Sequence, residues 1–317
     1  TREEIIGRIR DGGVVGLGGA GFPTHVKLSP KEPDKIEYIL VNGAECEPYL
    51  TSDYRRMMDQ PEKVVEGLKI VVGLFKNAKG CICIEDNKPD AVALMEEKVA
   101  PYDNIRVVAA KTQYPEGAEK MLIKKVMGRQ VPSGKLPADV GCVVSNTSTA
   151  KAISDAIQKG MPLVERAVSV TGDFIRNPGN YMVKLGTNVQ ELIDHCGGIT
   201  GDDVVLKMGG PMMGAPLKDT NVPIIKGSNG VIAIAADHTE EKECIKCGRC
   251  VDVCPMELQP LEIYKYGQLG DAEKLLTLNV MDCFSCKCCE YICSSKIPLV
   301  SKINAAKGLV MPLLKKK

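Results

Sequence analysis

Hydrophobic residues in the first half of the chain alternate between short continuous runs and amphipathic stretches, a pattern typical of buried strands separated by helices. It predicts strands at residues 38–41, 81–84, 105–109 and 140–144, and helices at residues 4–9, 61–75, 90–99, 117–127 and 146–160. Because these helices are long enough to act as crossover connections, we expect a layered α/β domain over residues 1–160.

The pattern changes near Pro162, where shorter strands surround a single short helix. Strands are predicted at residues 167–171, 181–185, 204–208 and 230–235, and a helix at residues 189–195. This mixture predicts a small α+β module of the β-grasp type over residues 161–236. The charged stretch 237–243 is typical of a linker, and helices are expected at residues 261–269 and 271–278 within a third, helical domain over residues 237–317.

Charge and hydropathy exclude several classes of partner. The chain of 317 residues carries 41 Lys and Arg against 40 Asp and Glu, so its net charge of +1 argues against nucleic acid as a main ligand. The longest apolar runs, 70–75 and 231–236, are far shorter than the roughly 18 residues of a spanning helix, so any membrane attachment is expected through a partner. Because the chain opens on Thr1, we expect an N-terminal segment to precede it.

Cysteine is the unusual component, with 14 residues in the chain and nine of them in its last quarter. A long chain without a signal-peptide pattern is expected to use clustered thiols for metal binding and not for disulfides. The run Cys244-x2-Cys247-x2-Cys250-x3-Cys254-Pro255 has the spacing of bacterial ferredoxins, in which the fourth cysteine ligates the second cluster. A second run of the same spacing begins 39 residues later at Cys283.

The two runs together predict two [4Fe–4S] clusters with exchanged fourth ligands. One ligand set is Cys244, Cys247, Cys250 and Cys293, and the other is Cys283, Cys286, Cys289 and Cys254. Zinc remains an alternative, although zinc sites favour two CxxC pairs with a longer spacer. Two departures from the ferredoxin pattern are Ser294 in place of the expected proline and the extra thiol Cys288, which is either a neighbour that does not bind metal or a competing ligand.

The remaining five cysteines are scattered, and we expect them to be small core residues. They are Cys46, Cys81, Cys83, Cys142 and Cys196. Cys46 has a second interpretation, as a redox-exposed thiol, because it lies within the acidic segment 42–48.

A glycine-rich segment, 16–21, precedes Phe22-Pro23-Thr24 near the N-terminus. Glycines let backbone amides approach a phosphate closely, but no clear strand precedes this segment and Pro23 stands where a dinucleotide-binding helix would begin. The residues alone therefore leave two interpretations open, a ligand-binding loop and an ordinary turn. The acidic segment 42–48 is equally open, as a functional strand end or a polar loop.

Taken together, these motifs resemble a known family. Gly16-x-Gly18-Gly19-x-Gly21-Phe22-Pro23-Thr24-x-x-Lys27 and Asn42-x-x-Glu45-x-Glu47-Pro48 resemble the flavin and NADH site of the flavoprotein subunit of respiratory complex I. Tyr114-Pro115-Glu116-Gly117-Ala118-Glu119, Val131-Pro132-Ser133-Gly134 and Asn146-Thr147-Ser148-Thr149 are more similar to the C subunit of the Rnf complex, an ion-translocating ferredoxin:NAD⁺ oxidoreductase. The order of flavin domain, β-grasp and two ferredoxin runs also matches that family.

The resemblance implies which residues contact FMN and NAD(H). The FMN contacts would be Gly16, Gly18, Gly19, Lys27, Asn42, Glu45, Asn146 and Thr149. Phe22 would stack on the nicotinamide nucleotide, and Glu47 and Glu119 would line its pocket. Ala118 replaces one of two adjacent glutamates of the complex I flavoprotein, so this part of the pocket departs from that pattern.

The implied activity is hydride exchange between NADH and FMN, followed by single-electron transfer through two [4Fe–4S] clusters, with no catalytic acid or base. The implied setting is a peripheral subunit on the cytoplasmic side of the cell membrane, bound to the other proteins of an Rnf-type complex. Two alternatives remain at this stage. One is a cobalamin-reductase-like flavoprotein, and the other is a polyferredoxin electron carrier without enzymatic activity.

Overall fold

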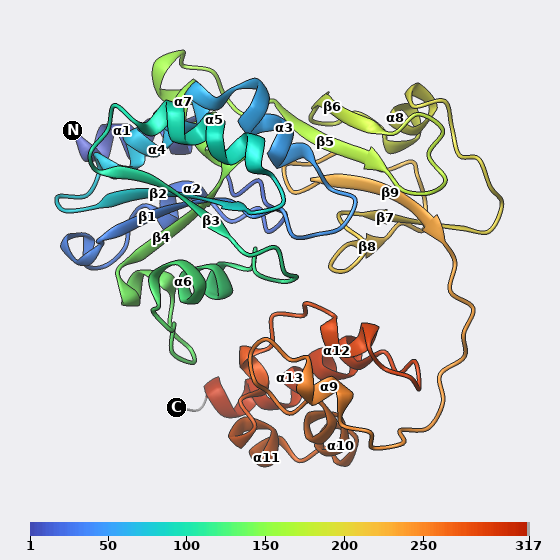
Figure 1. The fold of residues 1–317 in the computed structure, drawn as a ribbon. Helices are drawn as coiled ribbons and strands as arrows, with labels where there is room; N and C mark the ends of the chain where they lie inside the picture. Colours follow the sequence, from blue (N-terminus) through green and yellow to red (C-terminus); the bar gives the residue numbers. More distant parts are fainter. Residues whose placement is uncertain (316–317) are drawn as a thin grey trace. The chain divides into compact units, whose positions relative to one another are not determined.

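The computed structural model describes residues 1–315, which form two compact units (Figure 1). The first comprises residues 1–131 and 136–236, and the second comprises the short segment 132–135 and the residues from 237 onward. The first unit contains two sheets with their helices, and the second is helical. No helix among the described residues is both long and apolar enough to cross a lipid bilayer.

A parallel four-stranded sheet forms the centre of the N-terminal module. Its strands are β1 (Tyr38–Gly43), β2 (Lys79–Glu85), β3 (Ile105–Ala110) and β4 (Cys142–Asn146), in the order β3-β2-β1-β4. The four predicted strands are confirmed, but β4 begins two residues later than expected. The reason is a 3₁₀ turn over Pro137–Val140, which Gly141 ends with a φ of 74°.

Helices cover both faces of this sheet, as the alternating pattern predicted (Figure 1). One face packs against α1 (Arg2–Asp11), α3 (Ser52–Asp59), α4 (Pro61–Val72), α5 (Pro89–Val99) and α7 (Thr147–Gln158). The other face packs against α6 (Glu119–Met127), whose Leu122 and Ile123 are fully buried. Helix α3 has no predicted counterpart, and the short α2 (Thr24–Lys27) follows the glycine-rich segment.

Helices α4 and α7 approach each other closely at Gly67. A Cβ atom built on Gly67 would lie 1.9 Å from the carbonyl oxygen of Ala150, so no side chain fits between the two helices there. Such an approach of two backbones packs α7 tightly on the sheet and sets the position of its N-terminus, where Asn146 lies.

The second module is a five-stranded mixed sheet packed on one helix. Its strands are β5 (Glu165–Thr171), β6 (Gly179–Lys184), β7 (Val204–Met208), β8 (Ala215–Pro216) and β9 (Gly230–Ala235), in the order β6-β5-β9-β7-β8. Only the pair β5–β9 is parallel. Helix α8 (Val189–His195) buries Leu192 and Ile193 against the sheet, which confirms the predicted α+β module.

The second unit contains two similar halves. Its helices are α9 (Arg249–Asp252), α10 (Pro260–Leu269), α11 (Ala272–Thr277), α12 (Cys288–Tyr291) and α13 (Leu299–Lys315). Helices α12 and α13 begin 39 residues after α9 and α10, the same offset that separates the two cysteine runs. The long helix α13 was missed from the sequence, although this repeat indicates where it begins.

We expect Gly67→Ala to lower the free energy of unfolding of the first unit by about 1–3 kcal/mol, because the added methyl group overpacks the contact between α4 and α7. Gly7→Ala on α1 is the matched control, since nothing lies within 4 Å of a Cβ at Gly7 and alanine favours the helix by about 0.5–1 kcal/mol. Urea unfolding of both variants measures the difference. Equal stability of the two variants would contradict the close contact.

Candidate functional site

The carboxyl ends of β1 and β4 meet at one edge of the parallel sheet. The chain passes from β1 outward to β2 and β3, and then returns to place β4 on the other side of β1. Ligands of open α/β sheets bind at such a reversal of strand order, outside the carboxyl ends of the strands. Asn42 is the residue before the last of β1, and its partner in the strand register is Asn146, the last residue of β4.

The glycine-rich segment packs against this edge. The Leu17 amide donates a 2.9 Å hydrogen bond to the Thr149 hydroxyl. A Cβ on Gly18 would lie 3.6 Å from that of Asn146. Three of the residues selected by resemblance, Gly18, Asn146 and Thr149, therefore come together although they lie far apart in the sequence.

The glycine-rich segment folds into a compact loop in which several backbone amides donate no hydrogen bond to the described part of the chain. Gly16 donates its amide to Phe22 and Gly21 donates its own to Gly16, which closes the loop. The amides of Gly18, Gly19 and Ala20 donate no hydrogen bond within residues 1–315. Gly19 has a φ of 114°, a conformation that favours glycine. Free amides in a glycine loop beside a helix N-terminus suit the phosphate of a flavin nucleotide.

Asp53 is a residue of this site that the sequence did not indicate. From the first turn of α3 its carboxylate accepts hydrogen bonds from the Asn146 amide at 2.6 Å, the Thr147 hydroxyl at 2.8 Å and the Ser148 hydroxyl at 3.3 Å. These bonds hold the N-terminus of α7 and orient the Asn146 side chain. The motif Thr51-Ser52-Asp53 resembles an ordinary helix start, so nothing in the sequence points to this contact.

Glu45 lies next to Asp53 and caps the same helix. Its carboxylate accepts hydrogen bonds from the amides of Asp53 at 3.0 Å and Tyr54 at 3.1 Å. Glu45 is only partly buried as a residue, but burial of its carboxyl group raises its pKa to about 8, and the charge of Asp53 adds to the rise. Glu45 therefore gains a proton more readily than an ordinary glutamate.

Lys27, Asn42 and Glu119 are brought together at the same edge of the sheet. The Lys27 ammonium donates to the Glu119 carboxylate at 2.6 Å and to the Val144 carbonyl at 3.0 Å. The Asn42 amide donates to the Gly117 carbonyl at 2.8 Å. Lys27 and Glu119, which the resemblance assigns to FMN and to NAD(H) respectively, thus form one ion pair.

Glu47 connects the two modules of the first unit. Its carboxylate accepts hydrogen bonds from the amides of Met212 at 3.0 Å and Met213 at 2.7 Å, in the loop after β7. A Cβ on Gly210 would lie 2.2 Å from the same carboxylate, so the loop passes very close to it. Glu47 therefore fixes a loop of the second module at the edge of the candidate site.

Four of the five scattered cysteines are buried as predicted, and one is not. Cys81, Cys83, Cys142 and Cys196 are buried, but Cys46 is partly exposed. Cys46 follows Glu45 in the loop after β1, where its thiol lies against Gly117. The prediction of a core role was wrong for Cys46, because the acidic segment lies at the edge of the sheet and not beneath it.

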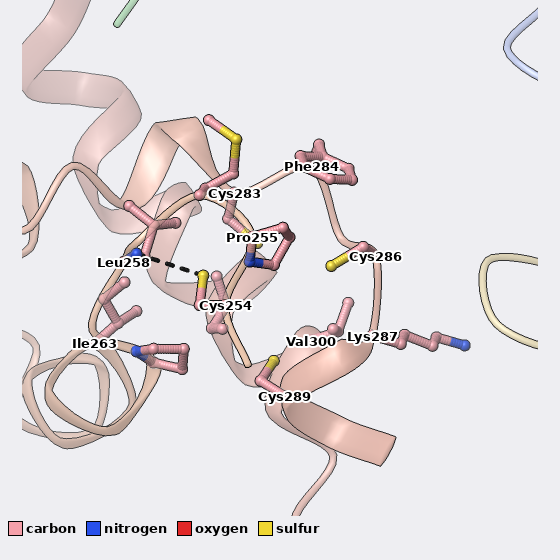
Figure 2. A pocket seen from close by; sticks show the side chains of 13 residues that line it. Cys254, Pro255, Leu258, Ile263, Cys283, Phe284, Cys286, Lys287, Cys289 and Val300 are labelled. Carbon is pink, nitrogen blue, oxygen red and sulfur yellow. Dashed lines mark hydrogen bonds between the residues drawn. The ribbon is translucent and has the colours of Figure 1, made fainter. Parts of the chain in front are cut away.

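Two cavities of the second unit are each lined by four cysteines. One is lined by Cys254, Cys283, Cys286 and Cys289 (Figure 2). The other is lined by Cys244, Cys247, Cys250 and Cys293. Each cavity thus combines three cysteines of one run with the fourth of the other.

The walls of both cavities suit an iron–sulfur cluster. The first is otherwise largely apolar, with Leu258, Ile263 and Val300 around the thiols in Figure 2. The second contains Leu261, Ile297 and Leu299. Four thiols in an apolar enclosure match the donor set of a [4Fe–4S] cluster. Cys288 is not among the residues that line either cavity.

The backbone of the two cysteine runs repeats in detail. Non-glycine residues rarely adopt a positive φ, and where they do the conformation is usually maintained for function. Here positive φ recurs at three pairs of positions that are 39 residues apart, namely Lys246 and Ser285, Gly248 and Lys287, and Glu257 and Lys296. Both runs therefore wrap around their cavities in the same way.

Comparisons with known proteins agree with this order of modules. The Nuo51 FMN-binding domain matches residues 9–155, the SLBB domain matches residues 167–216, and the 4Fe-4S dicluster domain matches residues 243–297. The C subunit of the Na(+)-translocating ferredoxin:NAD(+) oxidoreductase complex of Acetobacterium woodii is 43% identical over 302 residues, which cover 94% of this chain and 68% of the relative. The chain belongs to this family of C subunits.

Other members of the family show similar sequence identity and coverage. The C subunit of the proton-translocating ferredoxin:NAD(+) oxidoreductase complex of Clostridium ljungdahlii is 46% identical and aligns with 84% of this chain and 59% of its own length. The C subunit of the ion-translocating oxidoreductase complex of Rhodobacter capsulatus is 42% identical. The alignment covers 96% of this chain and 60% of that relative. The chain therefore spans about six tenths to two thirds of the length of these relatives.

Solved structures show the fold alone. A chain of an NAD⁺-reducing [NiFe]-hydrogenase in its H₂-reduced state aligns with a TM-score of 0.66 at 16% identity, over 98% of this chain and 61% of that one. A chain of the same kind of hydrogenase in its air-oxidised state aligns with a TM-score of 0.63 at 18% identity, over 98% of this chain and 53% of that one. Together the comparisons confirm the predicted family, the fold class and the cofactors FMN and [4Fe–4S]. The individual ligands and the domain boundaries stay predictions.

The raised pKa of Glu45 predicts a specific dependence of stability on pH. The folded state holds a proton on Glu45 that the unfolded state releases above about pH 4.5, so its contribution to stability is lost as the pH rises from 4.5 towards 8. Glu45→Gln cannot ionise, and its stability relative to the unsubstituted protein should rise between pH 5 and pH 8 in urea unfolding.

Glu62→Gln is the control for this measurement. Glu62 lies at the start of α4, where its carboxylate accepts hydrogen bonds from its own backbone amide and from Lys98, and both lower its pKa. The stability difference for Glu62→Gln should therefore be flat between pH 5 and pH 8. A flat difference for Glu45→Gln as well would show that Glu45 is ionised throughout.

Proposed function

We propose that this chain is the NAD(H)-interacting flavin and iron–sulfur subunit of a membrane-bound ferredoxin:NAD⁺ oxidoreductase. The observation that carries the proposal is the convergence of the glycine-rich loop, Asn42 and Asn146 at the switch point of the sheet, in a chain with two four-cysteine cavities. The names of the three relatives support the same function.

In this proposal the first module binds FMN through the residues at the switch point. The free amides of Gly18 and Gly19 receive the phosphate, and Gly16 closes the loop that presents them. Asn146 and Thr149 hold the loop against α7, while Asn42, Lys27 and Glu45 line the adjoining edge. FMN supplies hydride exchange with NADH on one side and single-electron exchange with the clusters on the other.

The nicotinamide nucleotide is assigned to the outer side of the loop. Phe22 is 48% exposed although it is a large aromatic residue, and its ring is therefore free to stack on a planar ligand. Glu119 and Glu47 provide carboxylate acceptors for ribose hydroxyls. Both carboxylates are held in place, Glu119 by Lys27 and Glu47 by the Met212 and Met213 amides, so neither has to be ordered when the nucleotide binds.

The eight cysteines of the two cavities are assigned as cluster ligands. Each cluster takes three thiolates from one run and the fourth from the other, and the two runs are thereby tied together. Held by these residues, the two clusters would supply single-electron transfer. The domain borders of the proposal follow the sequence prediction, with modules at residues 1–160, 161–236 and 237–317.

The proposed setting is the cytoplasmic face of the cell membrane, where the chain is a peripheral subunit. The relatives are named as parts of ion-translocating complexes, so the membrane-spanning function is assigned to other proteins of a complex of the same type. NAD(H) reaches the chain from the cytoplasm.

An NADH titration of the anaerobically reconstituted full chain tests this function. We expect NADH to bleach the visible absorbance of both the flavin and the clusters. Phe22→Ala should raise the NADH concentration for half-bleaching by about threefold to tenfold, because a stacking contact of about 0.5–1.5 kcal/mol is lost. Val26→Ala is the matched control, since Val26 is also 48% exposed on the neighbouring segment. Bleaching by dithionite but not by NADH would contradict the proposal and favour a polyferredoxin carrier.

Cysteine substitutions test the exchange of ligands between the runs. Cys254→Ala and Cys289→Ala should each remove the same cluster, while Cys293→Ala should remove the other, so iron content falls from about eight to about four atoms per chain in each variant. Electron paramagnetic resonance of the reduced protein distinguishes the two remaining clusters. Cys288→Ala, next to Cys289, should keep both. Loss of different clusters in Cys254→Ala and Cys289→Ala would refute the exchanged sets.

A further inference from the structure

A buried arginine of the second module reaches the glycine-rich loop of the first. Arg166 lies on β5 and is 3% exposed. Its guanidinium donates to the Leu17 carbonyl at 3.0 Å, and also to the carbonyls of Lys226 and Ala167. All three partners are main-chain oxygens, so no carboxylate directly neutralises the charge.

The contact with Leu17 sets the direction of a loop amide. The carbonyl of Leu17 and the amide of Gly18 belong to one trans peptide group, in which C=O and N–H point in opposite directions. Because Arg166 holds the carbonyl on its own side, the Gly18 amide points away from Arg166. That amide donates no hydrogen bond within the described residues. Thr149 holds the other end of Leu17 through its amide, so the orientation is fixed from two sides.

A second residue of the same module supports the loop in parallel. The Lys226 ammonium donates to the Gly13 carbonyl, and its own carbonyl accepts from Arg166. A Cβ on Gly227 would lie 3.0 Å from the Gly19 carbonyl. The segment before β9 thus packs along the glycine-rich loop, and Arg166 joins the two.

The Arg166 guanidinium remains positively charged at neutral pH despite its burial. Burial lowers its pKa to about 10, against an opposing effect of Asp53, so the guanidinium stays protonated at neutral pH. Arg56 on α3 is a second buried cation nearby and is 6% exposed. In a poorly solvated interior a fixed positive charge behind a loop of free amides favours an anionic ligand over a neutral one.

We propose that Arg166 is the positioning residue of the flavin loop and that its buried charge makes this loop select the phosphorylated flavin, FMN, over riboflavin. The second module thereby supports the flavin loop from the side opposite its free amides. This inference rests on the proposed FMN site and adds a residue, a selectivity and a role for the second module.

The test measures the dissociation constants of FMN and riboflavin on the flavin-free full chain, by quenching of flavin fluorescence. Arg166→Met should weaken FMN binding by about tenfold or more, because the buried positive charge behind the loop is lost, and should weaken riboflavin binding much less, since riboflavin carries no phosphate. The preference for FMN should therefore fall. Arg166→Lys keeps the charge and should keep the preference, although both ligands bind more weakly.

Two further variants make the outcome decisive. Arg176→Met is the matched control, since Arg176 is an exposed arginine of the same module that donates to the Gly197 carbonyl, and both affinities should be unchanged. Arg166→Gln removes the charge while keeping a donor for the Leu17 carbonyl, and replaces Arg166→Met if that variant does not fold. Equal weakening of FMN and riboflavin in the neutral variants, or no weakening, overturns the inference. Failure of the unsubstituted chain to bind either flavin overturns the proposed FMN site as well.

Discussion

The site depends on the hydrogen bonds that Asp53 accepts from the N-terminus of α7. A parallel sheet brings the carboxyl ends of β1 and β4 side by side, but it does not orient the side chains that follow them. Asp53 does so by holding Asn146, Thr147 and Ser148 from a separate helix. Its own helix is held in turn by Glu45, so two adjacent carboxylates organise one edge of the sheet.

This arrangement gathers charge in a partly enclosed region. Asp53 lies near the buried cations Arg56 and Arg166, Glu45 lies beside Asp53, and Lys27 pairs with Glu119 along the same edge. Buried charges need nearby compensation, which restricts how the surrounding loops can move. The second module takes part in that compensation through Arg166, Lys226 and the loop fixed by Glu47. The two modules of the first unit are therefore joined at the candidate site.

The helical unit is organised differently, as two copies of one motif that consists of a cysteine run and the helix after it. Its two cysteine runs share spacing, positive-φ positions and the starts of the following helices. The exchange of fourth cysteines makes each half incomplete without the other. Lys287 adopts at φ 65° the conformation that Gly248 adopts in the first half, so the second half keeps a strained residue in the loop that presents its cysteines.

How much the sequence predicted differs between these regions for physical reasons. The cysteine runs were evident because their geometry is local, with two-residue gaps that bring thiols around one cavity. Hydrophobic periodicity likewise placed all four strands of the first sheet, since buried parallel strands are continuous apolar runs. Helix α3 was missed because its residues are mostly polar and bury only Ser52, Arg56 and Met57. Helix α13 was missed because Gly308 and Pro312, which disfavour helices, interrupt its apolar pattern.

The classes of element, the order of the modules and the two sets of thiols follow from the amino-acid sequence alone, because each depends on residues close together in the chain or on repeated spacing. Three other contacts became visible only in the folded chain: Asp53 orients Asn146, Lys27 pairs with Glu119, and Arg166 holds Leu17. These pairs are separated by 93, 92 and 149 residues, and neither periodicity nor local spacing carries information over such distances. They form because the strand order reverses at β1 and the second sheet packs against the glycine-rich loop.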